Sequence, residues 1–264
     1  MKLMTYNILE GGLGRIDPIA EVIRLANADV VVVQEPWDVV LFHKLADRLG
    51  MDRFVAESPR NPEGSTGILS RFKIREAVNY APQDKRLTRS AFHAIIAVPT
   101  AEQTKAFELP IIGLHLQARE TLADEEIRLT ELPAILDIAK LFQGRSHVIA
   151  GDFNTSHPQQ QIDLNAVRKK TRDRIAAQND QFPREVVRTL LEYGYLDAHA
   201  LHHSPDDFET SFTTSHPAMR VDYIFITPDL APDVESCDVF KPEMAKFASD
   251  HFPVLAKIQL PPAK

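Results

Sequence analysis

The chain contains a single cysteine, Cys237, among its 264 residues. One thiol can form neither an intrachain disulfide nor a zinc site of four thiolates, so a secreted domain held together by disulfides is excluded. A reducing compartment fits this composition, and we expect the protein in the cytoplasm.

Long apolar segments are also missing. No stretch approaches the roughly 18 consecutive apolar residues that a membrane-spanning helix needs. The opening residues run from Met1 directly into polar Thr5, Tyr6 and Asn7, without the apolar segment of about 7 to 15 residues that a secretion signal contains. We therefore expect a soluble protein without integral membrane association. We also expect it to be a monomer.

The sequence also lacks an excess of positive charge. Lys and Arg number 30 against 37 Asp and Glu, and the net charge is −7. This argues against a protein held to nucleic acid mainly by a basic surface. The composition does not exclude a local basic groove. With 44% hydrophobic residues and 10 glycines the composition is that of an ordinary globular protein, and we expect one domain over residues 1–264.

Short apolar runs, many rich in β-branched residues, recur along the chain and end at polar residues, as buried strands do. They predict strands at Lys2 to Tyr6, Asp29 to Gln34, Thr66 to Ser70, Ser90 to Val98, Phe107 to Leu116, His147 to Ala150, Val221 to Ile226 and Pro253 to Ile258. Helical patterns lie at Pro18 to Ala28, Val39 to Leu49, Leu122 to Phe142 and Arg184 to Tyr193. The continuous run Val30 to Val33 is typical of a strand covered on both faces, so the fold class is α/β with flanking helices.

Polar residues stand where several of these strands end, and in α/β proteins side chains emerge from the sheet at such ends. The polar segments are Tyr6-Asn7, Gln34-Glu35-Pro36, Leu114-His115-Leu116, Gly151-Asp152-Phe153-Asn154, Arg220-Val221-Asp222-Tyr223 and Ser249-Asp250-His251. With Gly67 to Arg71 they form the ordered set T-Y-N, V-Q-E-P, G-I-L-S-R, L-H-L, G-D-F-N, R-V-D-Y and S-D-H. In this set the sequence resembles the endonuclease/exonuclease/phosphatase superfamily, and the resemblance covers nearly the whole chain.

The resemblance implies a four-layer α/β sandwich of the DNase-I-like kind, in which two packed mixed β-sheets are flanked by helices. It also implies a Mg²⁺-dependent phosphoesterase site at one edge of the sandwich. The substrate would be a phosphoester, with nucleic acid as one candidate.

The acidic residues in these segments favour a bound cation. Two like charges about 4 Å apart repel by roughly 1 kcal/mol in water and about 4 kcal/mol at an effective dielectric of 20, so a pocket of carboxylates needs compensation. Mg²⁺ prefers carboxylate, amide and water oxygens, with Mn²⁺ as a substitute. We expect Glu35 as the main ligand, with Asn7 and Asp250 assisting. Zinc is disfavoured here because the chain has no H-E-x-x-H helix and no cysteine pair.

By resemblance, Asp152 orients or deprotonates the attacking water, and Asn154 holds the phosphate or Asp152. His251 contacts a phosphate oxygen and Asp222 supports its imidazole. The residue types alone leave open whether Asp152 or the pair of His251 and Asp222 is the base, and we favour Asp152.

His115 separates branches of the superfamily, because abasic-site endonucleases carry tyrosine at the matching position. DNase-I-like and sphingomyelinase-like branches carry histidine there, which lowers the case for abasic-site repair. His115 can donate to a phosphate oxygen or protonate the leaving oxygen.

Several residues also have a purely structural interpretation. Asn7 can end a strand by bonding its own backbone, Asp152 and Asn154 can form an Asx turn, and His115 can be a core histidine. Arg220 either bridges a catalytic carboxylate or lies on the surface.

Other polar groups invite functions that we regard as weaker than the structural alternative. Adjacent His202 and His203 suggest a metal site, but neighbouring side chains diverge, which favours a loop rim. The basic residues Arg168, Lys169, Lys170, Arg172 and Arg174 spread around a helix as a solvated face would.

Three further basic residues, Lys85, Arg86 and Arg89, can bind a second phosphate. Trp37 and Phe153 are interpreted as packing residues, and Trp37 is also a candidate for the site rim.

The sequence thus predicts a hydrolase that attacks phosphorus with metal-positioned water. A nuclease or nucleotide-directed phosphodiesterase is the first hypothesis, and a phosphatase or phosphodiesterase for lipids or other small phosphoesters, sphingomyelinase-like or inositol-phosphatase-like, is the second. An inactive binding scaffold is the third, and the complete residue set opposes it. We expect the loops at Ser58 to Ser65, Ala81 to Thr88 and Pro158 to Arg184 to determine the substrate.

Overall fold

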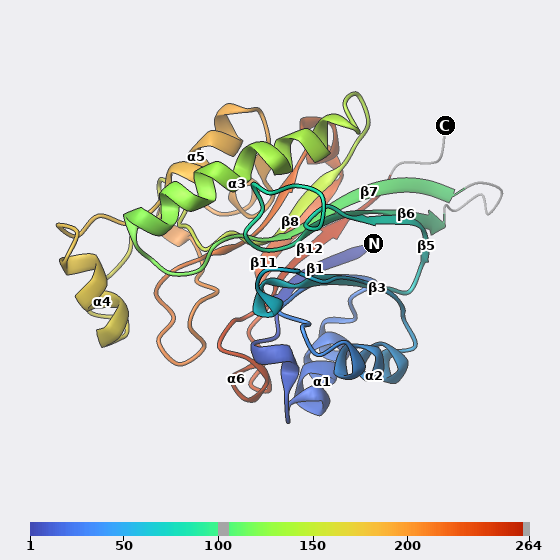
Figure 1. Ribbon diagram of the computed structural model, residues 1–264, viewed down its shortest axis with the longest axis horizontal. Coiled ribbons are helices and arrows are strands. Elements are labelled where there is room, and N and C mark those ends of the chain that lie inside the picture. The colour runs from blue at the N-terminus through green and yellow to red at the C-terminus, as the bar shows by residue number, and fades with distance from the viewer. Residues whose placement is uncertain (100–105, 261–264) are drawn as a thin grey trace.

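Two six-stranded β-sheets form the centre of the computed structural model, which describes residues 1–99 and 106–260 (Figure 1). The first sheet has the order β11-β12-β1-β2-β4-β3 and the second the order β5-β6-β7-β8-β10-β9. The strands of the first sheet are β1 (Lys2–Asn7), β2 (Val30–Gln34), β3 (Asp52–Ala56), β4 (Thr66–Ser70), β11 (Val234–Val239) and β12 (Val254–Ile258). Those of the second are β5 (Lys73–Asn79), β6 (Ala91–Pro99), β7 (Ala106–His115), β8 (Val148–Asp152), β9 (Leu196–Asp197) and β10 (Asp222–Ile226).

Both sheets are mixed, as predicted. Strands β1 and β2 are parallel, and so are β7 and β8, whereas the other neighbouring pairs are antiparallel. The two sheets pack face to face through one buried hydrophobic cluster that includes Val31 and Ile68 from the first sheet and Ile111 and Ile224 from the second. Burial of this shared apolar surface is the main force that joins the sheets.

Helices cover the outer faces of both sheets (Figure 1). Helices α1 (Ile16–Ala26), α2 (Val39–Leu49) and the short α6 (Ala245–Ala248) lie on the side of the first sheet, and α3 (Leu122–Lys140) and α5 (Glu185–Glu192) on the side of the second. Helix α4 (Lys169–Ala176) projects at one side. Helix, sheet, sheet and helix make four layers, so the predicted sandwich is confirmed.

Local signals set the ends of several helices. The Asp38 carboxylate accepts from the backbone N–H of Leu41 at the start of α2, and Gly50 ends that helix in the left-handed conformation with φ 62°. Thr121 caps α3 in the same manner, accepting from the N–H of Asp124. None of the helices in the described residues has the length and apolar character required to span a bilayer.

The eight predicted strands are the eight central strands of the two sheets, and their ends agree within about two residues of the expectation. The four strands that the sequence pattern missed, β3, β5, β9 and β11, are the four sheet edges. An edge strand is covered incompletely, so its sequence lacks a continuous apolar run: β5 reads KIREAVN and is buried at no position.

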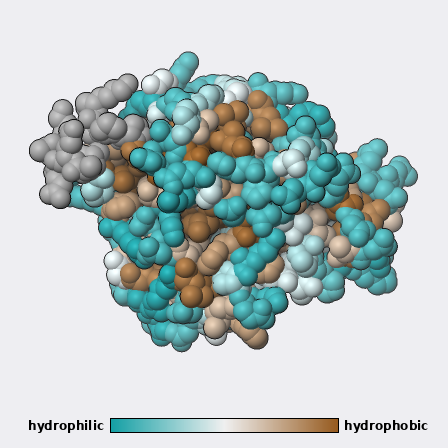
Figure 2. Space-filling view, turned by 180° about the vertical axis from the view of Figure 1, so that it is seen from behind, coloured by the Kyte–Doolittle hydropathy of each residue, from teal (hydrophilic) through white to brown (hydrophobic). Residues whose placement is uncertain are grey.

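The surface mixes polar and apolar groups. On the face opposite to the view of Figure 1, hydrophilic residues interrupt the hydrophobic ones (Figure 2). Exposed apolar side chains such as Leu13, Val40 and Phe247 come from separate elements, which is ordinary for a folded protein.

Candidate active site

The polar segments predicted from the sequence meet at one edge of the sandwich. Asn7 ends β1, Glu35 follows β2, His115 ends β7 and Asp152 ends β8. In the second sheet Asp152 pairs in register with His115 on one side and with Asp222 on the other. Strand register therefore places these side chains next to one another although most of the chain separates the first of them from the last.

A cavity of 220 Å³ lies at this edge, and we call it the strand-end cleft. Seven of the eight predicted site residues line it, namely Asn7, Glu35, His115, Asp152, Asn154, Asp250 and His251. Asp222 lies behind His251. Larger cavities exist, such as one of 700 Å³ beside Tyr195, but its lining contains none of these eight residues.

Asn7 connects the two sheets inside the cleft. Its Nδ2 donates to Oε1 of Glu35 over 3.2 Å and to Oδ2 of Asp152 over 3.1 Å, and its Oδ1 accepts from the backbone N–H of Leu9 over 3.0 Å. The last contact is the local turn that the structural alternative proposed. Asn7 therefore ends its strand and joins two carboxylates at the same time.

His251 is held by a chain of hydrogen bonds. Its Nδ1 lies 2.9 Å from Oδ2 of Asp222, which also accepts from Oγ of Ser211 over 2.7 Å. Its Nε2 lies 3.8 Å from Oδ2 of Asp152 and 4.0 Å from Oδ1 of Asp250. Burial alone lowers the pKa of His251, but Asp222 and then Asp152 raise it to about 10. Ser211 had no recognisable motif in the sequence.

Asp152 occupies the centre of the cleft and is fully enclosed. Burial and the neighbouring Asp222 charge raise the pKa of Asp152 to about 7, against the opposing effects of His251 and Asn7. Its Oδ1 accepts from the backbone N–H of Asn154 over 2.9 Å, which is an Asx turn, and β8 ends there without a following helix. The turn proposed as the structural alternative is thus present inside the site.

Two carboxylate oxygens in this group lack hydrogen bonds within the described residues: Oδ1 of Asp222 and Oδ1 of Asp250, both buried. Most buried polar atoms have a partner, so such orphaned acceptors call for a cation or a donor from elsewhere. Asp152, Asp222 and His251 also lie close enough together to hold an ion, with ligand atoms within 4.8 Å of one another. The donor set fits a metal, and its oxygen-rich composition fits a hard cation.

His115 lies on the cleft floor against a buried arginine. Nη1 of Arg89 is 2.7 Å from Nε2 of His115, and that Nε2 is 3.5 Å from Oδ2 of Asp152. Burial, then the Arg89 charge and His251, lower the pKa of His115 well below its usual value. Gly64 makes room for this arginine, because a Cβ there would lie 2.6 Å from Cγ of Arg89. Nη1 of Arg89 is also 2.9 Å from Nδ1 of His115. Because a guanidinium can only donate, one ring nitrogen of the neutral imidazole accepts from Arg89 and the other keeps an N–H that can donate.

Backbone conformation aims two of the cleft residues. Glu35 has φ 64° and Asn154 has φ 52°, in the left-handed region that costs a non-glycine residue about 1–2 kcal/mol. Hydrogen bonds hold Glu35 there: its N–H donates to the carbonyl of Ser65 and its carbonyl accepts from Gly11, both over 3.0 Å. Strain concentrated at such residues is a common mark of functional sites.

Three arginines form a rim along the cleft, which we call the arginine rim: Arg119, Arg168 and Arg174. Arg174 pairs with Glu120 at 2.6 Å, and the Arg168 guanidinium lies 4.9 Å from the Phe212 ring centre. Nη2 of Arg168 also lies 3.7 Å from Oε1 of Glu120, so a single carboxylate contacts two of the three arginines. The interpretation of residues 168 to 174 as a solvated face is wrong for Arg168 and Arg174, because α4 turns them toward the cleft, and it stands for exposed Lys169, Lys170 and Arg172.

Arg220 adopts neither of the two placements considered. It is fully buried and pairs with Asp197, with Nη2 2.6 Å from Oδ2, so it is a core ion pair and neither a surface residue nor a bridge to a catalytic carboxylate. Phe153 packs against Tyr223 and Phe225 as expected. Trp37, a candidate for the rim, is absent from the described lining of the cleft.

The comparison with protein families decides the classification. The model described as "Endonuclease/Exonuclease/phosphatase family" matches residues 4–251. The chain belongs to this family. Its description names enzymes that hydrolyse phosphate esters, so the predicted phosphoester hydrolase is confirmed at the level of the family. A search of curated proteins finds no significant match.

Solved structures agree with the fold. An endonuclease/exonuclease/phosphatase from Beutenbergia cavernae is 22% identical with a TM-score of 0.69, covering 98% of this chain and 71% of its own. An AP endonuclease from Archaeoglobus fulgidus is 19% identical with a TM-score of 0.70, covering 98% of this chain and 100% of its own. A 3′ phosphatase from Neisseria, bound to a product DNA hairpin, is 17% identical with a TM-score of 0.70 and the same coverage. Similarity at these identities supports the DNase-I-like architecture of this family member.

Proposed function

We propose that this protein is a divalent-metal-dependent phosphodiesterase of the nuclease or nucleotide-directed type, which hydrolyses a phosphoester bond with water. The observation that carries the proposal is the strand-end cleft. The cleft gathers several carboxylates, two of which have buried oxygens without hydrogen-bond partners among the described residues. It also contains an imidazole supported by a carboxylate, and the arginine rim lies along it.

We propose Mg²⁺ as the ion, with Mn²⁺ as a substitute. Glu35 would be the principal ligand and Asn7 and Asp250 would assist, because the orphaned Oδ1 of Asp250 and the Glu35 carboxylate both face the cleft. When bound, the ion supplies positive charge against the phosphoryl oxygens and activates a water molecule.

Asp152 is the proposed base that orients the water and accepts its proton. Nε2 of His251 faces the carboxylates of Asp152 and Asp250, and two negative neighbours favour the imidazolium, which cannot accept a proton. His251 is instead the proposed donor to a phosphate oxygen. Asp222 and Ser211 position its ring, and Asn154 holds Asp152 through its backbone N–H.

His115 is the proposed second donor to a phosphate oxygen. Its depressed pKa favours a neutral N–H over an imidazolium, so we assign it a hydrogen bond to the substrate and not protonation of the leaving group.

The arginine rim supports a substrate with more than one phosphate. Guanidinium groups form strong charge-assisted hydrogen bonds with phosphates, and the rim lies beside the carboxylates where the reacting phosphate would bind. A neighbour in fold binds a DNA hairpin product. A cavity of 220 Å³ is below the roughly 300–1,000 Å³ of pockets that enclose a whole ligand, so most of the substrate would extend along the rim.

Hydrolysis of small phosphoesters is the second candidate. The same small cavity, and a net charge of −7, suit a compact phosphoryl substrate better than a long nucleic acid. We further propose that residues 1–264 form one domain, acting as a monomer in the cytoplasm. The hydrophobic cluster shared by both sheets supports the single domain.

A substrate panel tests the function. The purified chain and its Asp152→Asn variant are assayed on single- and double-stranded DNA, RNA, nucleotides, sphingomyelin and inositol phosphates, with Mg²⁺ and then with a chelator. We expect chelator-sensitive turnover of nucleic acid or nucleotides by the wild type alone. Turnover confined to lipid or inositol substrates would select the second candidate, and no turnover of any substrate would favour a binding scaffold.

A further inference from the structure

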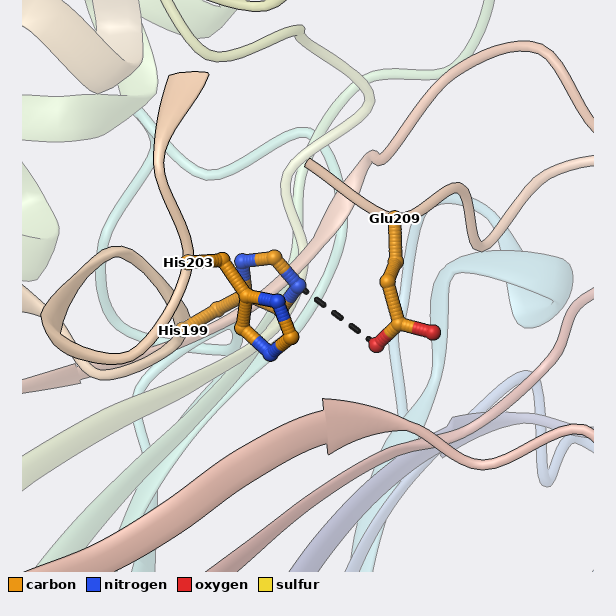
Figure 3. A group of neighbouring side chains, drawn as sticks. All are labelled: His199, His203 and Glu209. Atoms are coloured by element: carbon orange, nitrogen blue, oxygen red, sulfur yellow. Dashed lines mark ion pairs between the residues drawn. The ribbon is translucent and has the colours of Figure 1, made fainter. Parts of the chain in front are cut away.

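A second group of metal-ligating side chains lies outside the strand-end cleft. It consists of His199, His203 and Glu209, which we call the imidazole cluster, and none of the three lines the cleft. Figure 3 shows the two imidazole rings lying against each other with the Glu209 carboxylate directed toward them. The cluster sits by the edge strands β9 and β11, since His199 follows β9 closely and Glu209 contacts β11.

One turn of helix brings the two histidines together. A 3₁₀ turn spans His199–Leu201, and the backbone N–H of His203 donates to the carbonyl of His199 over 3.1 Å. Side chains four residues apart on a helical turn point to the same side. The ring centres are 4.0 Å apart and the planes differ by 14°. The sequence had suggested His202 and His203 as the pair, but His202 is exposed and His199 is the partner of His203.

Three of the four ring nitrogens of this cluster have no hydrogen-bond partner among the described residues. His199 is fully buried, and over residues 1–99 and 106–260 neither of its nitrogens makes a hydrogen bond; Nδ1 of His203 is likewise buried and unbonded. Oε2 of Glu209 lies 3.6 Å from Nε2 of His199, and Oδ2 of Asp207 lies 3.6 Å from Nδ1 of His203. A buried imidazole normally satisfies at least one nitrogen, so this arrangement calls for a ligand between the rings and the carboxylate.

Neighbouring groups form hydrogen bonds to the cluster of the kind that orient metal ligands in metalloproteins. Oδ1 of Asp238 lies 3.0 Å from Nε2 of His203, which directs the lone pair of that ring to Nδ1. The backbone N–H of Val239 donates to Oε2 of Glu209 over 2.6 Å. A carboxylate behind a ligating histidine fixes its tautomer and raises its basicity.

We propose that His199, His203 and Glu209 bind one Zn²⁺ ion, with water or the Asp207 carboxylate in the fourth position. Two imidazoles and a carboxylate suit a borderline metal of the zinc type, whereas Mg²⁺ prefers oxygen ligands alone. The three ligand atoms lie within 4.8 Å of one another. Ligands at about 2.0–2.1 Å from a tetrahedral ion are about 3.4 Å apart. Because an imidazole nitrogen binds a metal in the plane of its ring, the two stacked rings would rotate apart as the three side chains close on the ion.

A zinc ion at this position would tie the loop that carries Glu209 to β9 and β11. Ser211, two residues further along this loop, donates to Asp222 behind His251, so zinc would stabilise the support of the strand-end cleft without entering it.

Zinc affinity of the full chain tests the proposal independently of any substrate. The chain is titrated with Zn²⁺ in saturating Mg²⁺, against a chromogenic chelator, and Co²⁺ absorption reports the ligand geometry. We expect one tight zinc equivalent in the wild type. Asp238→Asn, which removes a contact behind a ligand, should weaken zinc binding by about 10- to 100-fold. His203→Ala and Glu209→Gln, which each remove a ligand, should weaken zinc binding by more than that. His202→Ala, the exposed neighbour, should bind as the wild type does.

Circular dichroism and thermal unfolding in the presence of a chelator distinguish a variant that has lost a zinc ligand from a variant that does not fold. Each variant is compared with itself in chelator: zinc should raise the unfolding temperature of His202→Ala and leave that of His203→Ala unchanged. If His203→Ala does not fold, the nearly isosteric Glu209→Gln decides. The proposal is overturned if no zinc equivalent binds in saturating Mg²⁺, or if Asp152→Asn abolishes zinc binding while Glu209→Gln retains it.

Discussion

The strand-end cleft and the imidazole cluster both gather polar side chains from distant parts of the chain, but they are built differently. The cleft is assembled from the ends of central strands, whose positions follow from strand register in a fully covered sheet. The imidazole cluster is assembled from a single 3₁₀ turn, a loop and an edge strand. A site on central strands is therefore positioned by the core itself, whereas a site at a sheet edge needs an additional tie, for which we propose zinc.

The two regions also differ in their chemistry. Carboxylate and amide oxygens dominate the cleft and favour a hard cation, while imidazole nitrogens dominate the cluster and favour a borderline one. Arg220 and Asp197 lie between them: Asp197 accepts from the backbone N–H of His199, and Arg220 stands two residues before Asp222. The predictions below separate the two regions or test this link.

The largest effect is expected from the centre of the cleft. Asp152→Asn and His251→Ala should each lower turnover by about 10²–10⁴-fold, because each removes a group proposed to move or donate a proton. Steady-state kinetics on the substrate that the panel identifies measures this. Asp206→Asn, an exposed carboxylate near the imidazole cluster, is the control. Full activity of either cleft variant, with folding verified by circular dichroism, would refute its assigned role.

The buried ion pair between the regions should carry a large share of stability. Arg220→Met leaves the Asp197 carboxylate buried without its partner, and removal of one member of such a pair costs about 3–5 kcal/mol. Urea unfolding measures the free energy of unfolding. The double variant Arg220→Met with Asp197→Leu should recover part of the loss, because no unpaired charge remains. Equal instability of the single and double variants would mean that packing, including the Tyr223 ring 4.4 Å from the guanidinium, dominates.

Metal affinity of the cleft should depend on Glu35. Glu35→Gln keeps the size of the side chain and removes its charge, so we expect Mg²⁺ to bind about 10- to 100-fold more weakly, an effect at least as large as that of losing an outer contact. Isothermal calorimetry measures the affinity, with exposed Glu63→Gln as the matched control. Unchanged Mg²⁺ affinity would exclude Glu35 as the principal ligand, and zinc binding by the imidazole cluster should be unaffected in both variants.

The arginine rim should act on substrate binding. Arg168→Gln and Arg174→Gln are each expected to lower kcat/KM by about 10-fold, mainly through KM, since a charge-assisted hydrogen bond contributes about 1.5–3 kcal/mol. Arg172→Gln on the same helix points away from the cleft and is the control. A loss in Arg172→Gln as large as in the rim variants would indicate a diffuse charge effect and would argue against a defined phosphate contact.

The smallest effect concerns pH and His157, whose ring packs 4.7 Å from Phe208 next to the imidazole cluster. Burial is the main cause that lowers the pKa of His157 from 6.5 to about 4. The folded state then binds protons less readily than the unfolded state. This contribution to stability is complete above pH 6.5 and is lost as the pH falls toward and below 4.

Between about pH 7 and about pH 5.5 the wild type should lose about 1 kcal/mol more of its free energy of unfolding than His157→Asn does. The asparagine keeps an acceptor for the backbone N–H of Gln159, which bonds Nδ1 of His157, but does not titrate. Denaturant unfolding at both pH values measures the difference. Parallel pH profiles of the two proteins would show that His157 does not contribute to the dependence.

Residue patterns predicted the central strands and the cleft but missed the sheet edges and the rim. Val30 to Val33 reveal a covered strand because an apolar run is required on both faces, and the polar residues that end such strands then converge by geometry. Edge strand β5 reads KIREAVN, with neither a continuous apolar run nor a regular alternation, and gives no such pattern. Arg119 lies in none of the sequence motifs, and which side of α4 faces the cleft, and with it the place of Arg174, depends on how that helix docks.

By itself, the sequence determined the α/β class, the family, and the set of acidic and imidazole groups that meet at one edge, because covered strands carry apolar runs and the polar motifs at their ends occur in the order typical of the family. Only the tertiary structure decided that Arg220 is buried against Asp197, that Ser211 supports Asp222, and that His199 rather than His202 stacks on His203. These contacts depend on turn geometry and on loops packed against edge strands, where no repeating pattern in the sequence records which side chain points inward.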